Sequence, residues 1–364
     1  MTIRDVINIL EEWAPLPYAE DFDNVGLLVG DASSNLTNIL VTHDALENVV
    51  QEAIDKNCNL IVCFHPILFS GIKRITGSNY VEKAILKAIK NDISIYALHT
   101  ALDNVSHGVN YGMANALGLI KPKILIPKKA HINKLVTYTP HASVENIKEA
   151  LFKAGAGQIG NYDQCSFGVS GEGTFRASKK ANPTIGDIGV QHKEPETQLH
   201  VIYEKHHESK ILKALFSNHP YEEVAYEITS LQNVLQNVGL GMIGTLQESI
   251  SEVAFLKHVK DTFKTGGIRH SALLGKPIKK VAVLGGSGAF GISQAIRSGA
   301  DIYITADLKY HDYYKAEKRI LLADIGHFES ECFTKTIIAD YLTEKIRNFA
   351  VVLSEENTNP INYL

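Results

Sequence analysis

Apolar, strand-like runs alternate with amphipathic helical segments along much of this 364-residue chain. From residue 38 the order is a strand (NILVTHD), a helix (ALENVVQEAIDKNC), a strand (NLIVCFHP), a helix (VEKAILKAIKND) and a strand (ISIYALHT). Strands that alternate with helices pair in parallel through crossover helices, so this order predicts an α/β fold with a layered core. Residues 235–364 repeat the pattern and end in a helix expected from about 327 to 347. Residues 1–125 and 235–364 are therefore predicted to be the two halves of one core.

The residues between these halves follow a different order. Residues 131–232 read as a strand, a helix, two strands, a helix and a last strand, which is the β-α-β-β-α-β order of a ferredoxin-like domain. The polar stretch 177–197 is expected to be its longest loop. Because exposed turns tolerate an inserted domain, residues 126–234 are predicted to be a domain inserted into the α/β core.

Composition excludes several classes of protein. The net charge of −4 and the pI near 6.4 leave no excess of Lys and Arg to bind phosphate backbones, so nucleic acid is not an expected partner. No apolar run approaches the roughly 18 residues of a membrane span, and the N-terminus lacks a secretory segment. The four cysteines form no C-x-x-C pair, which fits a reducing compartment. We therefore expect a cytoplasmic protein that does not contact a membrane.

Three predicted strands end in residues of the kinds that bind metal ions. His65 ends one strand, His99 and Asp103 follow the next, and His327 and Glu331 follow the strand RILLADIG. Open α/β sheets place function beyond the carboxyl ends of their strands, so these side chains are expected to converge. Residues four apart share one helix face at a separation of about 6 Å, which brings His327 and Glu331 together. Imidazoles with carboxylates make a mixed N/O ligand set suited to zinc, iron or manganese.

Each of these residues also has a purely structural interpretation. His65 fits a turn histidine whose ring bonds to a carbonyl, and Asp103 fits an N-cap or turn aspartate. His327 fits an incidental cap of a helix whose first turn favours acidic side chains such as Glu331. The pattern favours a metal site because all the strand ends carry such residues together, whereas any one of them alone favours the structural interpretation.

Seven short motifs resemble, in the same order, those of the Nif-three-like dinuclear metal-centre family, whose members are often labelled GTP cyclohydrolase type-two homologues. They are FDNVGLLVG (22–30), FHPILFSG (64–71), HTALDN (99–104), HPYEEVAYEI (219–228), GGSG (285–288), ADLKYHD (306–312) and GHFESE (326–331). The resemblance covers essentially the whole chain. Its middle part resembles the PII-like or CutA-like module of the family's longer bacterial members.

The resemblance implies a centre of two divalent ions bridged by a carboxylate. The metal ligands that it implies are His65, Asp103, His327 and Glu331. The family usually has two adjacent histidines where this chain has Phe64 followed by His65. One well-held ion and a second, weaker one are therefore expected. His99 and His311 are candidates to replace the missing imidazole or to orient the ligands.

The resemblance also implies a metal-dependent hydrolase, with GTP as the first substrate to test. In the cyclohydrolase reaction water attacks C8 of the guanine ring, and dihydroneopterin triphosphate and formate are the products. A metal-bound water would be the nucleophile, because a bound ion lowers the pKa of water toward about 7. His311, four residues after Asp307, is the candidate for proton transfer or substrate contact, and Asp307 is grouped with it as a candidate catalytic residue. A homohexameric ring with metal sites facing an inner cavity is the implied assembly.

Two other interpretations stay open. Gly286, Gly288 and Gly291 form a G-x-G-x-x-G pattern after a strand, with Asp307 about 20 residues on, as a dinucleotide-binding fold requires. The short helix after these glycines and the unexplained metal-type residues count against it. The other interpretation is a non-catalytic metal-binding scaffold or regulator whose PII-like insertion senses a ligand or docks a partner. Earlier in the chain, Asp23 and Asn24 are expected to be structural or to line the cleft.

Overall fold

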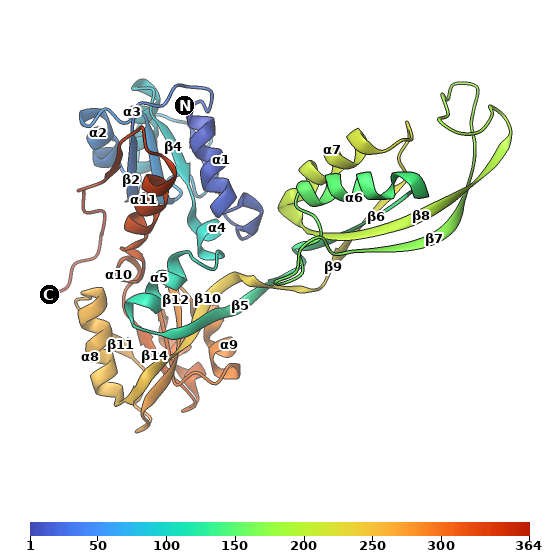
Figure 1. Cartoon of the computed structure of the whole chain (residues 1–364). Helices are drawn as coiled ribbons and strands as arrows, with labels where there is room; N and C mark the ends of the chain where they lie inside the picture. The colour runs from blue at the N-terminus through green and yellow to red at the C-terminus, as the bar shows by residue number, and fades with distance from the viewer. The chain divides into compact units, whose positions relative to one another are not determined.

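The computed structural model describes residues 1–364, which divide into two compact units. Unit 1 comprises Met1–Pro127 and Gln236–Leu364, and unit 2 comprises Lys128–Leu235. The chain passes between the units along β5 (Ile120–Lys129) and β10 (Val234–Ile250) (Figure 1). With three sheets and both parallel and antiparallel strands, the predicted α/β class is confirmed. None of the helices combines the length and the apolar character that crossing a membrane requires.

The first sheet of unit 1 combines strands from the N-terminal part of the chain with one strand near the C-terminus. Its strands are β1 (Gly26–Val29), β2 (Ile39–Asp44), β3 (Leu60–His65), β4 (Ser94–Ala97) and β15 (Val351–Leu353). They lie in the order β1-β4-β3-β2-β15, and all neighbours are parallel except β1 and β4. The parallel pairing predicted for residues 38–100 is confirmed. The three central strands β2, β3 and β4 are buried on both faces because helices cover both sides of a parallel sheet.

Helices cover the two faces of this first sheet (Figure 1). They are α1 (Ile3–Trp13), α2 (Glu47–Asp55), α3 (Tyr80–Lys90) and α11 (Thr334–Lys345). The apolar stripes of α2 and α3 pack on one face, where Val49 and Ile85 join a buried cluster with strand residues. On the other face α11 crosses β2 and β3, and its Tyr341 stacks on Trp13 of α1 with 4.3 Å between ring centroids.

The second sheet of unit 1 is mixed. Besides β5 and β10 it contains β11 (Arg269–His270), β12 (Ile278–Ser287), β13 (Ile302–Ala306) and β14 (Leu321–Asp324). The order is β11-β14-β13-β12-β10-β5, with β12, β13 and β14 parallel to one another. The helices of this region are α5 (Val109–Ala116), α8 (Glu252–Phe263) and the six-residue α9 (Ile292–Arg297). Their apolar side chains, among them Met113, Phe255 and Ala295, complete the core.

The end of the chain differs from the prediction of one closing helix over about residues 327–347. The structure has two helices, the short α10 (His327–Glu331) and then α11, which are separated by Cys332 and Phe333. The break lets α10 pack against β12 of the second sheet while α11 and β15 return to the first. The strands of the two sheets therefore do not follow one another along the chain, since β15, which comes after all the strands of the second sheet, belongs to the first.

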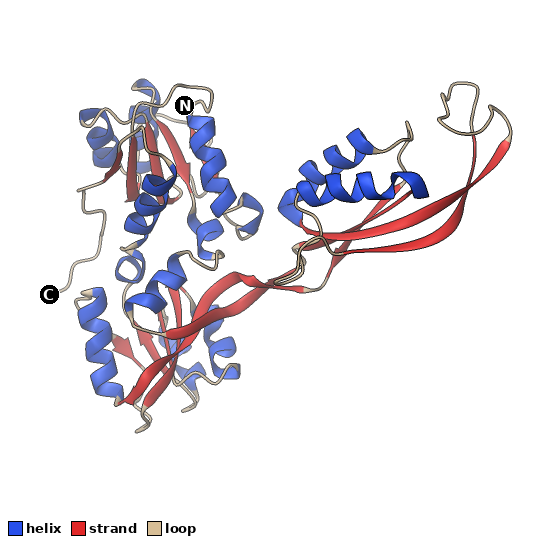
Figure 2. Cartoon of the chain, in the orientation of Figure 1, coloured by secondary structure: helices blue, strands red, loops and turns tan.

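Unit 2 is a four-stranded antiparallel sheet with two helices on one face (Figure 2). Its elements in chain order are β6 (Ile132–Pro140), α6 (Val144–Lys153), β7 (Ser166–Arg176), β8 (Gln191–Glu204), α7 (Glu208–Asn218) and β9 (Tyr226–Leu231). The strand order is β7-β8-β6-β9. Because β8 begins at Gln191, the loop predicted for 177–197 is shorter than expected. The core of unit 2 is formed by side chains such as Leu135, Leu151 and Ile211.

The carboxylate of Glu82 binds the loop that precedes α3 through several hydrogen bonds. Glu82 accepts hydrogen bonds of 2.7–3.0 Å from the backbone N–H and the hydroxyl of both Thr76 and Ser78. The side chain of Asn79 donates a further bond of 3.0 Å to Glu82 and caps the helix. The backbone N–H groups of Ser78 and Thr76 lower the pKa of the Glu82 carboxyl to about 2.

We predict that Glu82→Gln lowers the melting temperature of the chain at neutral pH. A depressed carboxyl pKa contributes stability above its unfolded value of 4.5, and this contribution is lost as the pH falls from 4.5 toward about 2. The difference from the native chain should therefore shrink below pH 4.5 and vanish near pH 2, as measured by circular dichroism melts. Glu47→Gln, in the first turn of α2, is the matched control. A difference that does not change with pH would contradict this account.

Candidate metal centre

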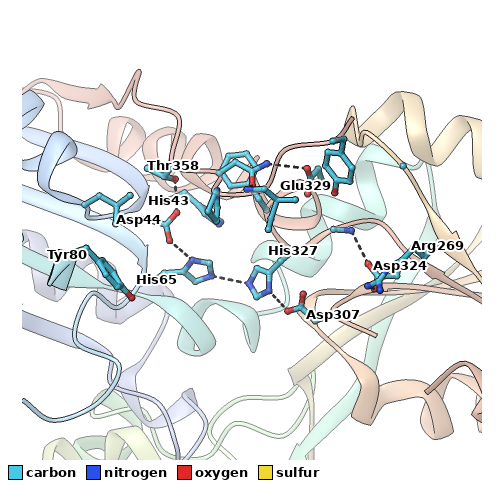
Figure 3. Close-up of a pocket in the computed structure, with 18 of the residues that line it drawn as sticks. His43, Asp44, His65, Tyr80, Arg269, Asp307, Asp324, His327, Glu329 and Thr358 are labelled. Carbon is cyan, nitrogen blue, oxygen red and sulfur yellow. Dashed lines mark hydrogen bonds and ion pairs between the residues drawn. The ribbon is translucent and has the colours of Figure 1, made fainter. Parts of the chain in front are cut away.

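The metal-type residues of the strand ends meet between the two sheets of unit 1 (Figure 3). His65 is the last residue of β3 in the first sheet. His327 and Glu331 are the first and last residues of α10, which follows β14 of the second sheet. Gly326, which precedes α10, has a φ of +93°, a conformation that glycine adopts without strain. This turn directs His327 toward His65, although 262 residues separate the two in the chain.

Three donor atoms lie together at this point. Nε2 of His327 is 3.4 Å from Nε2 of His65, and Oε2 of Glu331 is 3.2 Å and 3.3 Å from these two nitrogens. Ligands of a tetrahedral zinc ion with bonds of about 2.0–2.1 Å are separated by roughly 3.3 Å. Glu331 is only 3% exposed, and its Oε2 has no hydrogen-bond partner. The donor set therefore fits a divalent cation, since buried polar atoms without partners are rare.

Two aspartates hold the metal-facing imidazoles in orientation. Oδ1 of Asp44 is 2.8 Å from Nδ1 of His65, and Oδ2 of Asp307 is 2.7 Å from Nδ1 of His327. Because each carboxylate accepts a hydrogen bond from Nδ1–H, the Nε2 lone pairs are directed at the centre. The hydroxyl of Thr358 donates to Asp44 at 2.6 Å. Sequence analysis missed Asp44, although it ends β2, and it grouped Asp307 with His311 rather than with His327.

Charge and burial act in opposite directions on these groups. Burial by itself lowers the pKa of His65, but the hydrogen bond with Asp44 and the charge of Glu331 raise it to about 9. Burial also lowers the pKa of His327, but the hydrogen bond with Asp307 and the charge of Glu331 raise it to about 11. Burial raises the pKa of Glu331, but both imidazoles hold it well below its usual range. A cation that binds these imidazoles must therefore displace protons from them.

Asp103 lies in the wall of a smaller cavity of about 610 Å³, which Glu331 and His327 also line. It ends α4 (His99–Asp103), is 8% exposed, and its Oδ1 has no hydrogen-bond partner. Burial, followed by the charge of Glu331, raises the pKa of Asp103 well above its usual range. Asp103 does not belong to the group of His65, His327 and Glu331, whose donor atoms all lie within 4.8 Å of one another. Its role as a ligand stays a prediction.

The other two predicted histidines lie in different surroundings. His99 lines the smaller cavity, and its Nδ1 is 2.7 Å from Oδ1 of Asp23. Asp23 therefore orients His99. His311, in the 3₁₀ helix Tyr310–Ala316, is exposed, packs its ring near Tyr310 and does not line either cavity beside the centre. Its part in proton transfer or substrate contact stays a prediction.

The glycine pattern at the end of β12 allows close packing. Gly286 has a φ of +65°, and a side chain there would collide with Oε1 of Glu331. Side chains at Gly288 and Gly291 would collide with the hydroxyl of Tyr303 on the neighbouring strand. The spacing that suggested dinucleotide binding is thus explained by the approach of the backbone to α10 and β13.

Sequence analysis also missed His43, one residue before the end of β2. It forms a second close group with Asp44 and His65, in which the donor atoms lie within 4.8 Å of one another. Burial, and then the charge of His65, lower the pKa of His43 to about 4, so the ring is neutral. Its position at a strand end is the signal that could have indicated it.

A larger cavity of about 1260 Å³ also borders the centre. His43, Asp44, His65, Asp307 and His327 all contribute to its wall (Figure 3). His65 and His327 therefore line both cavities.

Comparisons with known proteins show which family the chain is similar to. The chain matches the family model Duf34/NIF3 (NGG1p interacting factor 3) over residues 1–360. It is 35% identical over 366 residues to a Bacillus subtilis protein named GTP cyclohydrolase 1 type 2 homolog, covering 99% of this chain and 98% of that protein. A Staphylococcus epidermidis protein of the same name is 34% identical over 368 residues, with complete coverage of both chains.

Solved structures give the same result. A Bacillus cereus protein related to NIF3 superposes with a TM-score of 0.84 at 34% identity, covering 100% of this chain and 99% of that one. The Staphylococcus aureus protein SA1388 superposes with a TM-score of 0.78 at 28% identity, again with 100% and 99% coverage. The family resemblance carried by the seven motifs is confirmed, and the chain belongs to the DUF34/NIF3 family.

Proposed function

We propose that this protein binds one or two divalent cations at the centre in unit 1 and is a metal-dependent hydrolase that acts on a nucleotide. The observation that carries the proposal is the triangle of His65, His327 and Glu331, whose donor atoms lie 3.2–3.4 Å apart. The name of the curated relatives makes GTP the first substrate, in a reaction that yields dihydroneopterin triphosphate and formate.

His65, His327 and Glu331 would hold the first ion, and Asp103 would offer its unpartnered oxygen beside them. Nitrogen and oxygen donors together suit zinc, iron or manganese. When bound, such an ion polarises an electrophile and lowers the pKa of coordinated water to about 7. Asp44 and Asp307 keep the imidazoles in the tautomer that the ion requires.

The smaller cavity supplies the groups that a substrate would meet. Its volume of about 610 Å³ lies within the roughly 300–1,000 Å³ of small-molecule sites. Phe22, Phe69 and Phe290 contribute apolar surface to its wall, which suits a planar base and limits water. His99 is held by Asp23 through Nδ1, so its Nε2 is suited to give or take a proton.

A second candidate function is a metal-binding regulator without catalysis, and a cavity in unit 2 favours it. This cavity of about 550 Å³ has buried Glu196 in its wall, bonded at 2.8 Å to the hydroxyl of Tyr221. The β-α-β-β-α-β order and the antiparallel sheet support a ferredoxin-like, PII-like module inserted between the halves of the core. Such a module would sense a ligand or dock a partner.

The cellular setting and the assembly belong to the same proposal. Four free cysteines suit a reducing cytoplasm. A homohexamer with inward-facing centres would restrict substrates by size, and light scattering of the purified chain measures its mass directly.

We predict that the native chain binds divalent metal and that His327→Ala and Glu331→Ala both abolish binding. Each removes one donor of the triangle, and Glu331→Ala leaves two imidazoles that repel each other when protonated. Metal per chain is measured by mass spectrometry, and GTP turnover by formate release. Glu329→Gln is the matched control, because Glu329 lies on the same helix but bonds to Asn359.

The outcomes separate the two candidate functions. A native chain without bound metal would contradict both. Stoichiometric metal that is lost in the two alanine variants, with no turnover of GTP or other nucleotides by the native chain, would favour the regulator.

We further predict that Asp307→Asn and Asp44→Asn weaken metal binding about 10–100-fold without abolishing it. The amide keeps the size of the side chain, but it no longer offers a charged acceptor to Nδ1 of the ligating histidine. Competition with a chelator measures the change in affinity. Asp261→Asn, exposed on α8, serves as the control. Unchanged affinity in both variants would show that these carboxylates do not orient the ligands.

A further inference from the structure

A buried histidine without a hydrogen-bond partner lies beside the centre. His43 is 3% exposed, and neither of its ring nitrogens has a partner. Buried polar atoms are nearly always paired, so two unpaired nitrogens on one ring call for an explanation. A structural histidine of the core would donate one N–H to a carbonyl or carboxylate, as His219 does to the carbonyl of Tyr138 at 3.0 Å.

The surroundings of His43 are apolar except toward the centre. Its ring lies against Phe64 and Phe328, with centroids 5.5 Å and 5.2 Å away. On the remaining side it stands edge-on to His65, with 4.5 Å between ring centroids, and its Nε2 is 3.7 Å from Oε2 of Glu331. The ring is therefore directed at the same carboxylate oxygen that the triangle shares.

The sheet register places His43 next to Phe64. β2 and β3 are parallel and pair Thr42 with Cys63 and Asp44 with His65, so His43 and Phe64 stand at the same level. Phe64 is fully buried, and its ring contacts both His65 and His99. A phenyl ring cannot bind a cation through a lone pair. At this level of the sheet, the only imidazole is that of His43 on β2.

We propose that His43 is a metal ligand and that, together with the carboxylate of Glu331, it holds the second ion from the strand beside Phe64. The inference rests on the proposed metal centre. The separation of 3.7 Å between Nε2 and Oε2 is a few tenths of an ångström above that of ligands on one tetrahedral ion, which is roughly 3.3 Å. A small rotation of the ring closes this difference. An imidazole ligand makes the second position suited to zinc or iron(II) rather than magnesium or calcium.

The test compares four chains: the native one, His43→Leu, Phe64→His, and the two changes together. Leucine keeps the position filled and apolar but removes the nitrogens. We expect His43→Leu to keep the first ion and to weaken the second at least ten-fold, and the double variant to regain it because the imidazole returns on β3. Zinc titration with a chromophoric chelator measures both affinities, and the absorption spectrum of bound Co²⁺ reports the change in ligands.

The controls separate this inference from the proposed function. His107→Leu removes an exposed histidine and should bind both ions like the native chain. A native chain that binds no metal overturns the centre as a whole. A native chain that binds metal, with His43→Leu equal to it in stoichiometry, affinity and Co²⁺ spectrum, overturns only the role of His43.

A measurement on the native chain keeps the test independent of folding of the variants. X-ray absorption at the zinc edge, with two equivalents bound, should show three imidazoles shared by two ions. Two imidazoles over two ions would overturn the proposal. If His43→Leu does not fold, His43→Gln keeps a polar side chain in its place and is expected to give the same loss of the second ion.

Discussion

The carboxylate of Glu331 is the group on which the core of unit 1 depends. It is buried between two sheets, and it meets an imidazole from each of them, His65 at the end of β3 and His327 at the start of α10. A buried charge needs compensation, and removing one partner of such a group costs far more than removing an exposed pair. The centre is thus the site of the proposed chemistry, and its contacts also link the two sheets. Gly286 leaves the space that this carboxylate occupies.

The sequence indicates part of this arrangement because functional side chains gather beyond the carboxyl ends of strands in α/β sheets. That rule, with the helical spacing of four residues, selected His65, His99, Asp103, His327 and Glu331. The family resemblance then implied His65, Asp103, His327 and Glu331 as the ligands. It could not show that β3 and β14, the strand before α10, belong to different sheets. Nor could it show that α11 and β15 return to the first sheet after α10. Such returns depend on long-range packing, which local periodicity does not encode.

The residues that were missed share a physical cause. His43 and Asp44 lie in a short strand that begins with three apolar residues, so they read as part of the strand rather than as its functional end. Their importance appears only when β2 is seen beside β3 in register, with Asp44 opposite His65. Conversely, the glycines at the end of β12 form a recognisable motif, but these positions need glycine because the backbone packs closely against Tyr303 and α10. A motif indicates a local backbone shape, and several functions and contacts use the same shape.

The return of the C-terminal segment to the first sheet has a consequence for the newly made protein. On the ribosome, β2, which ends at Asp44, emerges long before its edge partner β15, which begins at Val351. His65 likewise waits for His327 and Glu331, which are translated more than two hundred residues later. The N-terminal sheet must therefore persist with an open edge during synthesis, a state that is prone to mispairing. Capture of a cation by all three donors can follow only the synthesis of α10, so in the proposed centre it would be a late step of folding.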